Sequence, residues 1–400
     1  MPDSFANLIA RSVGARLLSG LLVCMMLVVL DISYRQGVTP VAQAVWSDSE
    51  KESAGRATGA LVSTGRGYIP MPPDTPAAHA SNLLAMPATH PAAMMAFWFA
   101  GARESAPDVQ IAASNFDRAT QQWSQARWVV NRHALAEPLG FGVRRLGNPV
   151  AWLDPQGRIH LFVVATGWGG WAAGRIVHLR QHGQDADFAN LSFDVVRVLP
   201  LSWLWNTSFL VRTAPLPLQD GGMVLPVHFE LGIKYPVALR FDAGGEFKGM
   251  VRISSRKYLL QPTLLMASES HWLALMRDHS PVGRVAAAQT TDGGQHWSDL
   301  PDLALNNPDS SVAGVAVAPG KMFLAHNSSL HDRRVLDLSA SVDGPQWALA
   351  QGLEKGASDD AEYSYPALAW SENSLWVTYT DHRKRIAWQR FSFAAEARLN

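Results

Sequence analysis

The stretch Thr290-Thr291-Asp292-Gly293-Gly294-Gln295-His296-Trp297 fits the pattern Ser/Thr-x-Asp-x-Gly-x-x-Trp, and this pattern decides the fold. A shortened copy, SVDGPQW, occupies 341–347, and its Asp343 follows Asp292 by 51 residues. A weaker copy covers 240–245, and a longer, degenerate copy covers 114–123. A repeat of about 50 residues suits one four-stranded blade of a β-propeller.

The residue types in this repeat explain a local turn. An Asp side chain can accept hydrogen bonds from the backbone of its own hairpin. Glycine adopts the positive φ that such a turn needs, and the Trp is expected to pack at the outer edge of the blade. We therefore expect Asp292 and Asp343 to be structural residues, not catalytic ones.

Short apolar segments recur from Met94 to Phe393, separated by Gly, Asp, Asn and Pro, with no sustained helical periodicity. Roughly 300 residues, at about 50 per blade, predict an all-β fold, a six-bladed β-propeller, over 91–395. A hydrophobic fraction of 48% excludes a disordered chain, and a net charge of zero argues against nucleic acid as a partner.

The N-terminus carries an uncharged apolar run, Leu17–Leu30, preceded by Arg11 and Arg16. We expect 1–34 to hold a short cytoplasmic stub and a membrane anchor or uncleaved signal segment, with the propeller exported to the periplasm or the cell exterior. The alternative is a secreted protein, cleaved at the A-x-A-like site Ala42-Gln43-Ala44.

The segment 35–90 is rich in Ala, Pro, Ser, Gly and Thr. It is expected to be a linker, or irregular chain strapped over a domain. Cys24 is the sole cysteine, so neither an intrachain disulfide nor a cysteine-based metal site can form. The sequence contains no H-E-x-x-H metal motif and no phosphate-binding loop, and no cofactor is expected.

The repeats are identified as Asp-boxes, or bacterial neuraminidase repeats, and the stretches between them resemble the sialidase-like propeller family. The resemblance covers about 94–393, and its segments keep the family's order. In chain order they are FAGARESAPDV (99–109), Asn148-Pro149, LPVHFE (225–230), Gln261-Pro262 with Leu275-Met276-Arg277, NPDS (307–310), and YSYP (363–366) with Tyr379-Thr380.

The resemblance implies a glycosidase chemistry suited to an acidic sugar. Sialic acid carries a carboxylate on its anomeric carbon, so sialidases use a neutral Tyr as nucleophile, activated by a base that is typically Glu. A carboxylic acid protonates the leaving oxygen. The matching segments assign Asp108 as the acid, with Glu104 as its rival, Glu230 as the base and Tyr363 as the nucleophile.

Two tyrosines compete for the role of nucleophile. Tyr363 and Tyr365 alternate with Ser364, so both are expected on one face of an extended segment. Tyr363 is slightly preferred, which leaves Tyr365 as a substrate contact. Packing of the two rings in the protein core is the structural alternative.

Arginine forks hold carboxylates through paired hydrogen bonds. Arg277 is the best clamp for the substrate carboxylate, because it closes an apolar strand; a surface ion pair with Asp278 is the alternative. Arg334 lies one blade later, and Arg103, Arg383 and His228 complete the expected substrate contacts, although a lone strand His is commonly just a satisfied polar residue. Trp168 and Trp171 are expected either to stack on a sugar or to pack in the core.

The chain also departs from the family pattern. It has no Phe/Tyr-Arg-Ile-Pro segment, and the family's Tyr-Thr-Trp reads Tyr379-Thr380-Asp381. Three functions therefore stay open. They are an exo-glycosidase for a sialic-acid-like or other acidic terminal sugar, a non-catalytic propeller for glycan binding or envelope polysaccharide assembly, and a lyase or hydrolase for uronic acids.

Overall fold

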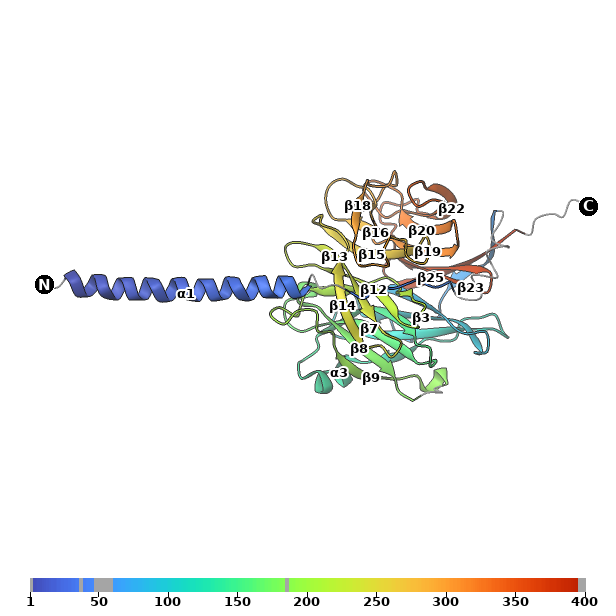
Figure 1. Ribbon diagram of the computed structural model, residues 1–400. Helices are drawn as coiled ribbons and strands as arrows, with labels where there is room; N and C mark the ends of the chain where they lie inside the picture. The colour runs from blue at the N-terminus through green and yellow to red at the C-terminus, as the bar shows by residue number, and fades with distance from the viewer. Residues whose placement is uncertain (1–2, 36–38, 47–59, 184–186, 395–400) are drawn as a thin grey trace, which may run out of the picture.

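The computed structural model describes residues 3–35, 39–46, 60–183 and 187–394, which form one long helix and a ring of six antiparallel sheets (Figure 1). The ring is the expected six-bladed β-propeller. Sheets are numbered here as blades in chain order of their innermost strands, and each sheet contacts the next around the ring. Besides the long helix α1 (Asp3–Arg35), a short helix α3 (Arg132–Leu139) and two 3₁₀ turns, η1 (Trp171–Ala173) and η2 (Phe188–Asn190), lie among the blades.

The strands follow each blade from the innermost outward. Blade one comprises β2 (Ala77–Ala85), β3 (Ala92–Gly101), β4 (Gln110–Asp117) and β5 (Arg127–Val130). Blade two comprises β6 (Arg145–Leu153), β7 (Ile159–Thr166), β8 (Arg175–Gln181) and β9 (Phe193–Val198). Blade three comprises β10 (Phe209–Val211), β12 (Met223–Phe229), β13 (Tyr235–Phe241) and β14 (Phe247–Arg252), with β11 (Leu216–Pro217) paired to β12.

The C-terminal half continues in the same way. Blade four comprises β15 (Leu259–Met266), β16 (Trp272–Asp278), β17 (Ala286–Thr290) and β18 (Ser298–Leu300). Blade five comprises β19 (Ala313–Ala318), β20 (Lys321–Asn327), β21 (Val335–Ser341) and β22 (Ala348–Lys355). Blade six comprises β23 (Tyr363–Ser371), β24 (Ser374–Asp381), β25 (Arg385–Phe393) and β1 (Leu61–Tyr68).

Blade six closes the ring, because its outermost strand β1 comes from the N-terminal side of the chain and pairs with β25 from Leu61↔Phe393 to Tyr68↔Ala387. The expectation of a linker across 35–90 is therefore wrong for 61–68 and 77–85, which are strands β1 and β2. Composition misled here because β1 is an edge strand with mostly exposed side chains, and its Gly, Ser and Thr read as linker.

Residues 39–46 instead form the strap that the sequence left open as an alternative. Ala44 donates its backbone N–H to Glu269 O at 2.8 Å and forms an isolated bridge with Leu218. Ala42 and Ala44 are buried against the core of blades three and four. The two alanines of the A-x-A-like site are thus buried in the folded protein, whereas Gln43 between them is exposed.

The Asp-boxes are turns, as expected. Asp292 Oδ1 accepts the backbone N–H groups of Gln295 and His296, both at 3.0 Å, and Asp343 Oδ1 accepts that of Gln346 at 3.0 Å. Asp242 and Asp117 hold the corresponding turns of blades three and one. Each of these turns joins the third strand of a blade to the fourth.

Four innermost strands share a bulge near their start. The bulged residues have left-handed backbones, with φ of 46° at Asn148, 49° at Gln261 and 52° at Tyr365, each before a proline, and 57° at Ala80. Strand register shifts at each of these positions. Such a bulge re-aims a side chain out of the regular pleat. Asn148-Pro149, Gln261-Pro262 and Tyr365-Pro366 are therefore bulges. They lie at the end of the ring where the innermost strands begin and the second strands finish, which is called the site end below.

Helix α1 meets the propeller at the site end, whereas β25 runs toward the opposite end and the C-terminus (Figure 1). The segment Val13–Arg35 is long and apolar enough to cross a membrane, since an 18-residue stretch within it has a mean hydropathy of 2.3 and is not buried in the protein. These properties are compatible with the expected anchor or signal segment.

Candidate functional site

Four arginines gather at the site end, and they are called the arginine cluster. Arg212 follows β10, Arg277 lies near the C-terminal end of strand β16, Arg333 precedes β21, and Arg383 follows β24. They come from four successive blades, and closure of the ring brings them together. Polar contacts link three of them in one continuous network.

The centre of the network is Tyr365. Its phenol oxygen accepts a hydrogen bond from Gln261 Nε2 at 3.4 Å, and Gln261 Oε1 accepts from Arg277 Nη1 at 3.4 Å. The ring of His79 lies 4.2 Å from the Tyr365 ring, centroid to centroid. Burial lowers the pKa of His79 well below its usual value, and nearby arginines lower it further, so this imidazole is neutral.

Arg277 is held by Asp309, not by its neighbour Asp278. Arg277 Nε donates to Asp309 Oδ1 at 2.5 Å, and His279 Nδ1 lies 2.7 Å from Asp309 Oδ2. Burial acts to lower the pKa of Arg277, but the Asp309 hydrogen bond and the charges of Tyr365, Asp309 and Glu230 raise it overall. Asp278 pairs instead with Arg256.

Glu362 bridges the two arginines on the other side. It accepts from Arg383 Nε at 2.9 Å and from Arg333 Nη1 at 3.2 Å. Burial acts to raise the pKa of Glu362, but Arg383, Arg333 and Ser364 lower it to about 2. Arg383 also pairs with Glu104 from blade one, which extends the network to the loop after β3.

Glu230 follows β12 and lies at the same end. Its Oε2 is 3.3 Å from Nε2 of the buried His228, and its Oε1 is 3.9 Å from Lys234 Nζ. Burial acts to raise the pKa of Glu230, but the His228 hydrogen bond and the charges of His228, Lys234 and Arg277 lower it overall. Glu230 is therefore a carboxylate at neutral pH, as a proton acceptor must be.

Arg212 differs from the other three arginines. Its side chain is almost fully buried, and its two terminal nitrogens donate to the carbonyls of Ser81 at 3.1 Å and Pro366 at 2.8 Å. No carboxylate pairs with it among the described residues. Its guanidinium carbon lies 5.1 Å from the Tyr365 ring centroid. Burial lowers the pKa of Arg212 to about 10, opposed by the charge of Tyr365, so it still carries a positive charge at pH 7.

The two tyrosines do not share a face, so that expectation is wrong. The bulge at Tyr365 breaks the strand alternation. Tyr365 turns toward His79 and Gln261, whereas Tyr363 packs against Tyr379 and His382, with ring centroids 6.3 Å and 5.5 Å away. Tyr365, not Tyr363, stands within the arginine cluster.

Arg334 also lies apart from the cluster. It pairs with Asp332 at 2.9 Å and with the fully exposed Asp359 at 2.7 Å. The neighbouring Arg333 takes the place that the sequence assigned to Arg334. Blade spacing located the loop, but spacing alone cannot choose between adjacent arginines whose side chains point in different directions.

The loop after β3 carries the other predicted residues. Asp108 is exposed, and its Oδ2 accepts the backbone N–H of Ala102 at 2.8 Å, which closes the loop. Arg103 is exposed and lines a small recess together with His79, Glu104 and Arg383. Their roles stay predictions.

Trp168 and Trp171 were expected either to stack on a sugar or to pack in the core, and they differ in their surroundings. Trp168 is 82% exposed, and Arg144 lies over its ring at 3.6 Å. Trp171 packs against the core of blades two and three. Of the two, Trp168 is the one whose side chain is exposed to solvent.

Sequence reasoning gave no role to His79, Arg212, Arg333 or Glu362. Arg212 could have been noticed, since a charged residue directly after the buried strand β10 is unusual unless it has a polar purpose. Gln261 and Asp309 lay in the matched Q-P and N-P-D segments, but no chemistry was attached to them.

Comparisons with known proteins identify the family and the fold of this chain. The family model described as BNR repeat-like domain matches residues 92–377. The chain belongs to this family. No curated protein sequence matches this BNR repeat-like protein.

Solved structures share the fold of this BNR repeat-like protein. The Hadza microbial sialidase Hz136 is 17% identical, with a TM-score of 0.62 over 78% of this chain and 65% of that one. Trypanosoma rangeli sialidase in complex with sialic acid is 13% identical, with a TM-score of 0.61 over 84% and 60% of the two chains. A protein of unknown function from Dyadobacter fermentans is 10% identical, with a TM-score of 0.62 over 84% of this chain and 100% of that one. This chain thus spans less than two thirds of the length of the two sialidases.

Proposed function

We propose that this protein is an exo-glycoside hydrolase that removes a terminal sialic-acid-like or other acidic sugar from a glycan. The observation that carries the proposal is a tyrosine phenol set among four arginines at the mouth of a sialidase-like propeller. Arg212 supplies a buried positive charge that has no carboxylate partner among the described residues, and its guanidinium carbon lies 5.1 Å from the centroid of the Tyr365 ring. An acidic sugar suits such a site, because positive charge at short range attracts its carboxylate.

The residues divide the reaction between them. The substrate carboxylate binds at Arg277, with Arg383 and Arg333 beside it. The Tyr365 oxygen attacks the anomeric carbon and its proton passes to Glu230, while Asp108 protonates the departing oxygen and the glycosidic bond breaks. Water, deprotonated by Asp108, then releases the sugar from Tyr365 and the proton on Glu230 returns to the phenol. Tyr365 and Glu230 both lie near Arg277, because the charges of both raise the pKa of Arg277.

Turnover of aryl glycosides of sialic acid and of other acidic sugars tests the proposal. The wild-type chain should release the aryl group from at least one of them. Arg277→Ala and Glu230→Ala should abolish release while the thermal unfolding curve keeps a single cooperative transition. Wild-type turnover in both variants would contradict the assignment.

A second function, binding an acidic glycan without cleaving it, is favoured by one observation. Asp309 already holds Arg277, and Glu362 with Glu104 already holds Arg383. A substrate carboxylate must compete with these protein carboxylates. Glycan-array binding together with no released monosaccharide across the same panel would favour this second function.

A further inference from the structure

The last two turns of α1 are built into the propeller. Asp31 is 2% exposed, and its carboxylate accepts the Ser202 hydroxyl at 2.7 Å and the backbone N–H groups of Trp203 at 3.1 Å and Leu204 at 3.2 Å. The helix thus ends in a polar socket formed by the loop before β10. A carboxylate in such a socket fixes both the height and the direction of the helix.

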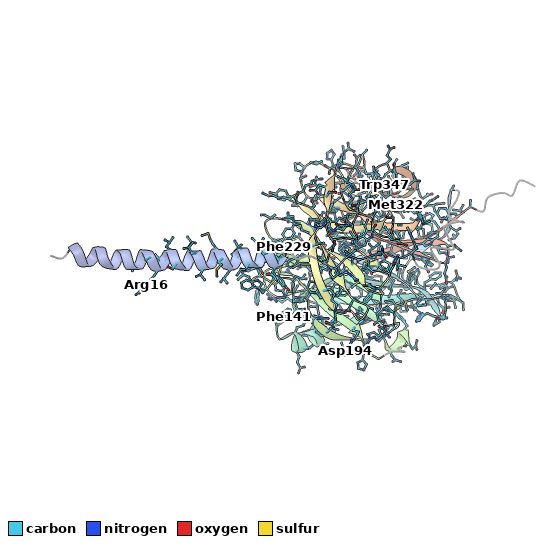
Figure 2. The ribbon with its side chains drawn as sticks, viewed as in Figure 1. Arg16, Phe141, Asp194, Phe229, Met322 and Trp347 are labelled. Carbon is cyan, nitrogen blue, oxygen red and sulfur yellow. The ribbon has the colours of Figure 1, made fainter. Side chains whose placement is uncertain are left out.

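Arg35 adds a second attachment one turn later. It pairs with Asp31 at 2.5 Å and donates to Ser202 Oγ at 3.0 Å. Its guanidinium lies 5.7 Å and 5.4 Å from the ring centroids of Phe209 and Phe229. Figure 2 labels Phe229 where α1 meets the propeller, and Phe229 is the residue before Glu230 of the candidate site. The helix therefore joins the protein beside the site.

No spacer separates the apolar helix from this socket. Leu30 directly precedes Asp31, and the stretch from Val13 to Leu30, in which Arg16 is the sole charged residue, is about 27 Å long at 1.5 Å per residue, close to the roughly 30 Å core of a bilayer. If this stretch spans a membrane, the bilayer surface lies level with Asp31. It then also lies level with the Trp203 and Leu204 amides that Asp31 binds.

Exposed apolar side chains gather at the same end. Trp203 and Trp205 are each 51% exposed and Leu204 is 45% exposed in the socket loop, and Leu231 and Ile233 are 42% and 51% exposed in the loop after Glu230. Loops of neighbouring blades add others: Trp168, Tyr258, Val282 and Leu330. All of these positions lie in connections at the site end. We call this set the apolar rim.

We propose that the apolar rim rests in the interface of the bilayer that α1 spans, so that the candidate site opens toward the lipid head groups. Trp and Tyr favour this depth, because their rings have an apolar body and a polar edge. Arg144, which stacks on Trp168, can reach phosphate from there. A bilayer is favoured over a protein partner because the rim continues the surface of a membrane-spanning helix without a gap.

This placement narrows the range of expected substrates, and that consequence rests on the proposed glycosidase activity. A site that faces head groups meets acidic sugars carried by lipids of the same membrane before it meets soluble glycans. The membrane contact itself does not depend on catalysis. Depth measurements therefore test it separately from any assay of turnover.

The experiment uses the full chain with Cys24→Ser, reconstituted in vesicles of phosphatidylethanolamine and phosphatidylglycerol. Single cysteines introduced by Trp203→Cys, Ile233→Cys and Val342→Cys carry nitroxide labels, and Val342 is 72% exposed at the opposite end of the propeller. Power saturation then compares the access of oxygen, which concentrates in lipid, with that of a water-soluble nickel chelate. Circular dichroism confirms that each variant is folded.

Labels at 203 and 233 should favour oxygen over nickel, by at least several-fold relative to the label at 342. If folded proteins labelled at 203 and 233 match the label at 342, the proposal is overturned. Strong spin–spin broadening at 203 and 233 would instead assign the rim to a second copy of the chain, and that result would overturn it as well. Two independent rim positions keep the test decisive if one variant folds poorly.

Discussion

Gln261 and Tyr365 are 104 positions apart in the chain, yet the amide nitrogen of the first lies 3.4 Å from the phenol oxygen of the second. The two residues occupy equivalent bulges in the innermost strands of blades four and six, and each precedes a proline. Repetition of one structural device in different blades thus places two different chemical groups at the ring centre. The bulge determines where the side chain lies, and the residue type determines its chemistry.

The two tyrosines offer a matched pair of variants. Tyr365→Phe should lower turnover of an acidic aryl glycoside by roughly 10³-fold or more, as loss of a nucleophile does. Tyr363→Phe should leave turnover within a few-fold of wild type, because Tyr363 packs against Tyr379 away from the cluster. Steady-state kinetics measure both. Equal losses in the two variants would remove the special role of Tyr365.

Asp309→Asn tests whether Arg277 is a clamp. Without the Asp309 charge, Arg277 should bind a sugar carboxylate more tightly, so the KM for an acidic glycoside or the Kd of an acidic sugar should fall several-fold. Stability should fall as well, because a largely buried guanidinium loses its partner. Asp332→Asn, which disturbs the outlying Arg334, is the control. Weaker sugar binding in Asp309→Asn would indicate that Asp309 itself positions the ligand.

Glu362 should make stability depend on pH. Its pKa in the folded state is about 2, below the ordinary 4.5, so the unfolded chain takes up its proton first as pH falls. The stabilisation is therefore complete above about pH 5, and it is lost progressively as pH falls toward 2. The Tm of wild type should drop over this window more steeply than that of Glu362→Gln. Parallel curves would contradict the assigned ion pairs.

Variants at two glycines distinguish the energetic cost of a strained turn from the cost of displacing the strap 39–46. Gly293 and Gly320 have φ of 70° and 68°. An added Cβ would lie 2.0 Å from the Ala42 carbonyl oxygen at position 293, but 3.6 Å from its nearest neighbour, the Val342 carbonyl oxygen, at position 320. Gly320→Ala should cost about 1 kcal/mol for the backbone alone. Gly293→Ala should cost clearly more and expose 39–46 to proteases. Equal unfolding free energies would show that the strap contributes nothing to stability.

The docking of α1 makes a prediction about stability. Asp31→Ala leaves Arg35 and the amides of Trp203 and Leu204 without their carboxylate, so it should lower the free energy of unfolding by about 3 kcal/mol. Asp359→Ala, at a fully exposed ion pair, should leave the Tm unchanged. Thermal unfolding of the full chain in detergent micelles compares them. An unchanged Tm in Asp31→Ala would mean that the helix end is not part of the folded unit.

The sequence predicted the fold well, because a propeller repeats the same local turn. Asp292 and Asp343 act as expected, since the hydrogen bonds of an Asp-box involve only its own hairpin. Ring closure by β1 was missed for the opposite reason. Its pairing with β25 joins residues more than 300 positions apart, and nothing local in 61–68 announces it.

The site was predicted in part. Arg277, Arg383, Glu104, His228 and Glu230 do lie at the site end, because each follows or closes the second strand of its blade. The sequence did not reveal that Tyr363 and Tyr365 point to different surroundings, because the bulge at Tyr365 breaks the alternation of side chains. Arg212 and Glu362 were missed because their importance comes from partners that are distant in the sequence.

Covalent labelling tests the central claim, that Tyr365 acts as the nucleophile within the arginine cluster, most directly. The full chain is incubated with 2,3-difluorosialic acid and with fluorinated analogues of other acidic sugars, then digested and examined by mass spectrometry. The account predicts a sugar adduct on the Tyr365 side chain that is absent from Tyr365→Phe. Turnover of the matching glycoside with an adduct on Tyr363, or on any other residue, would contradict it.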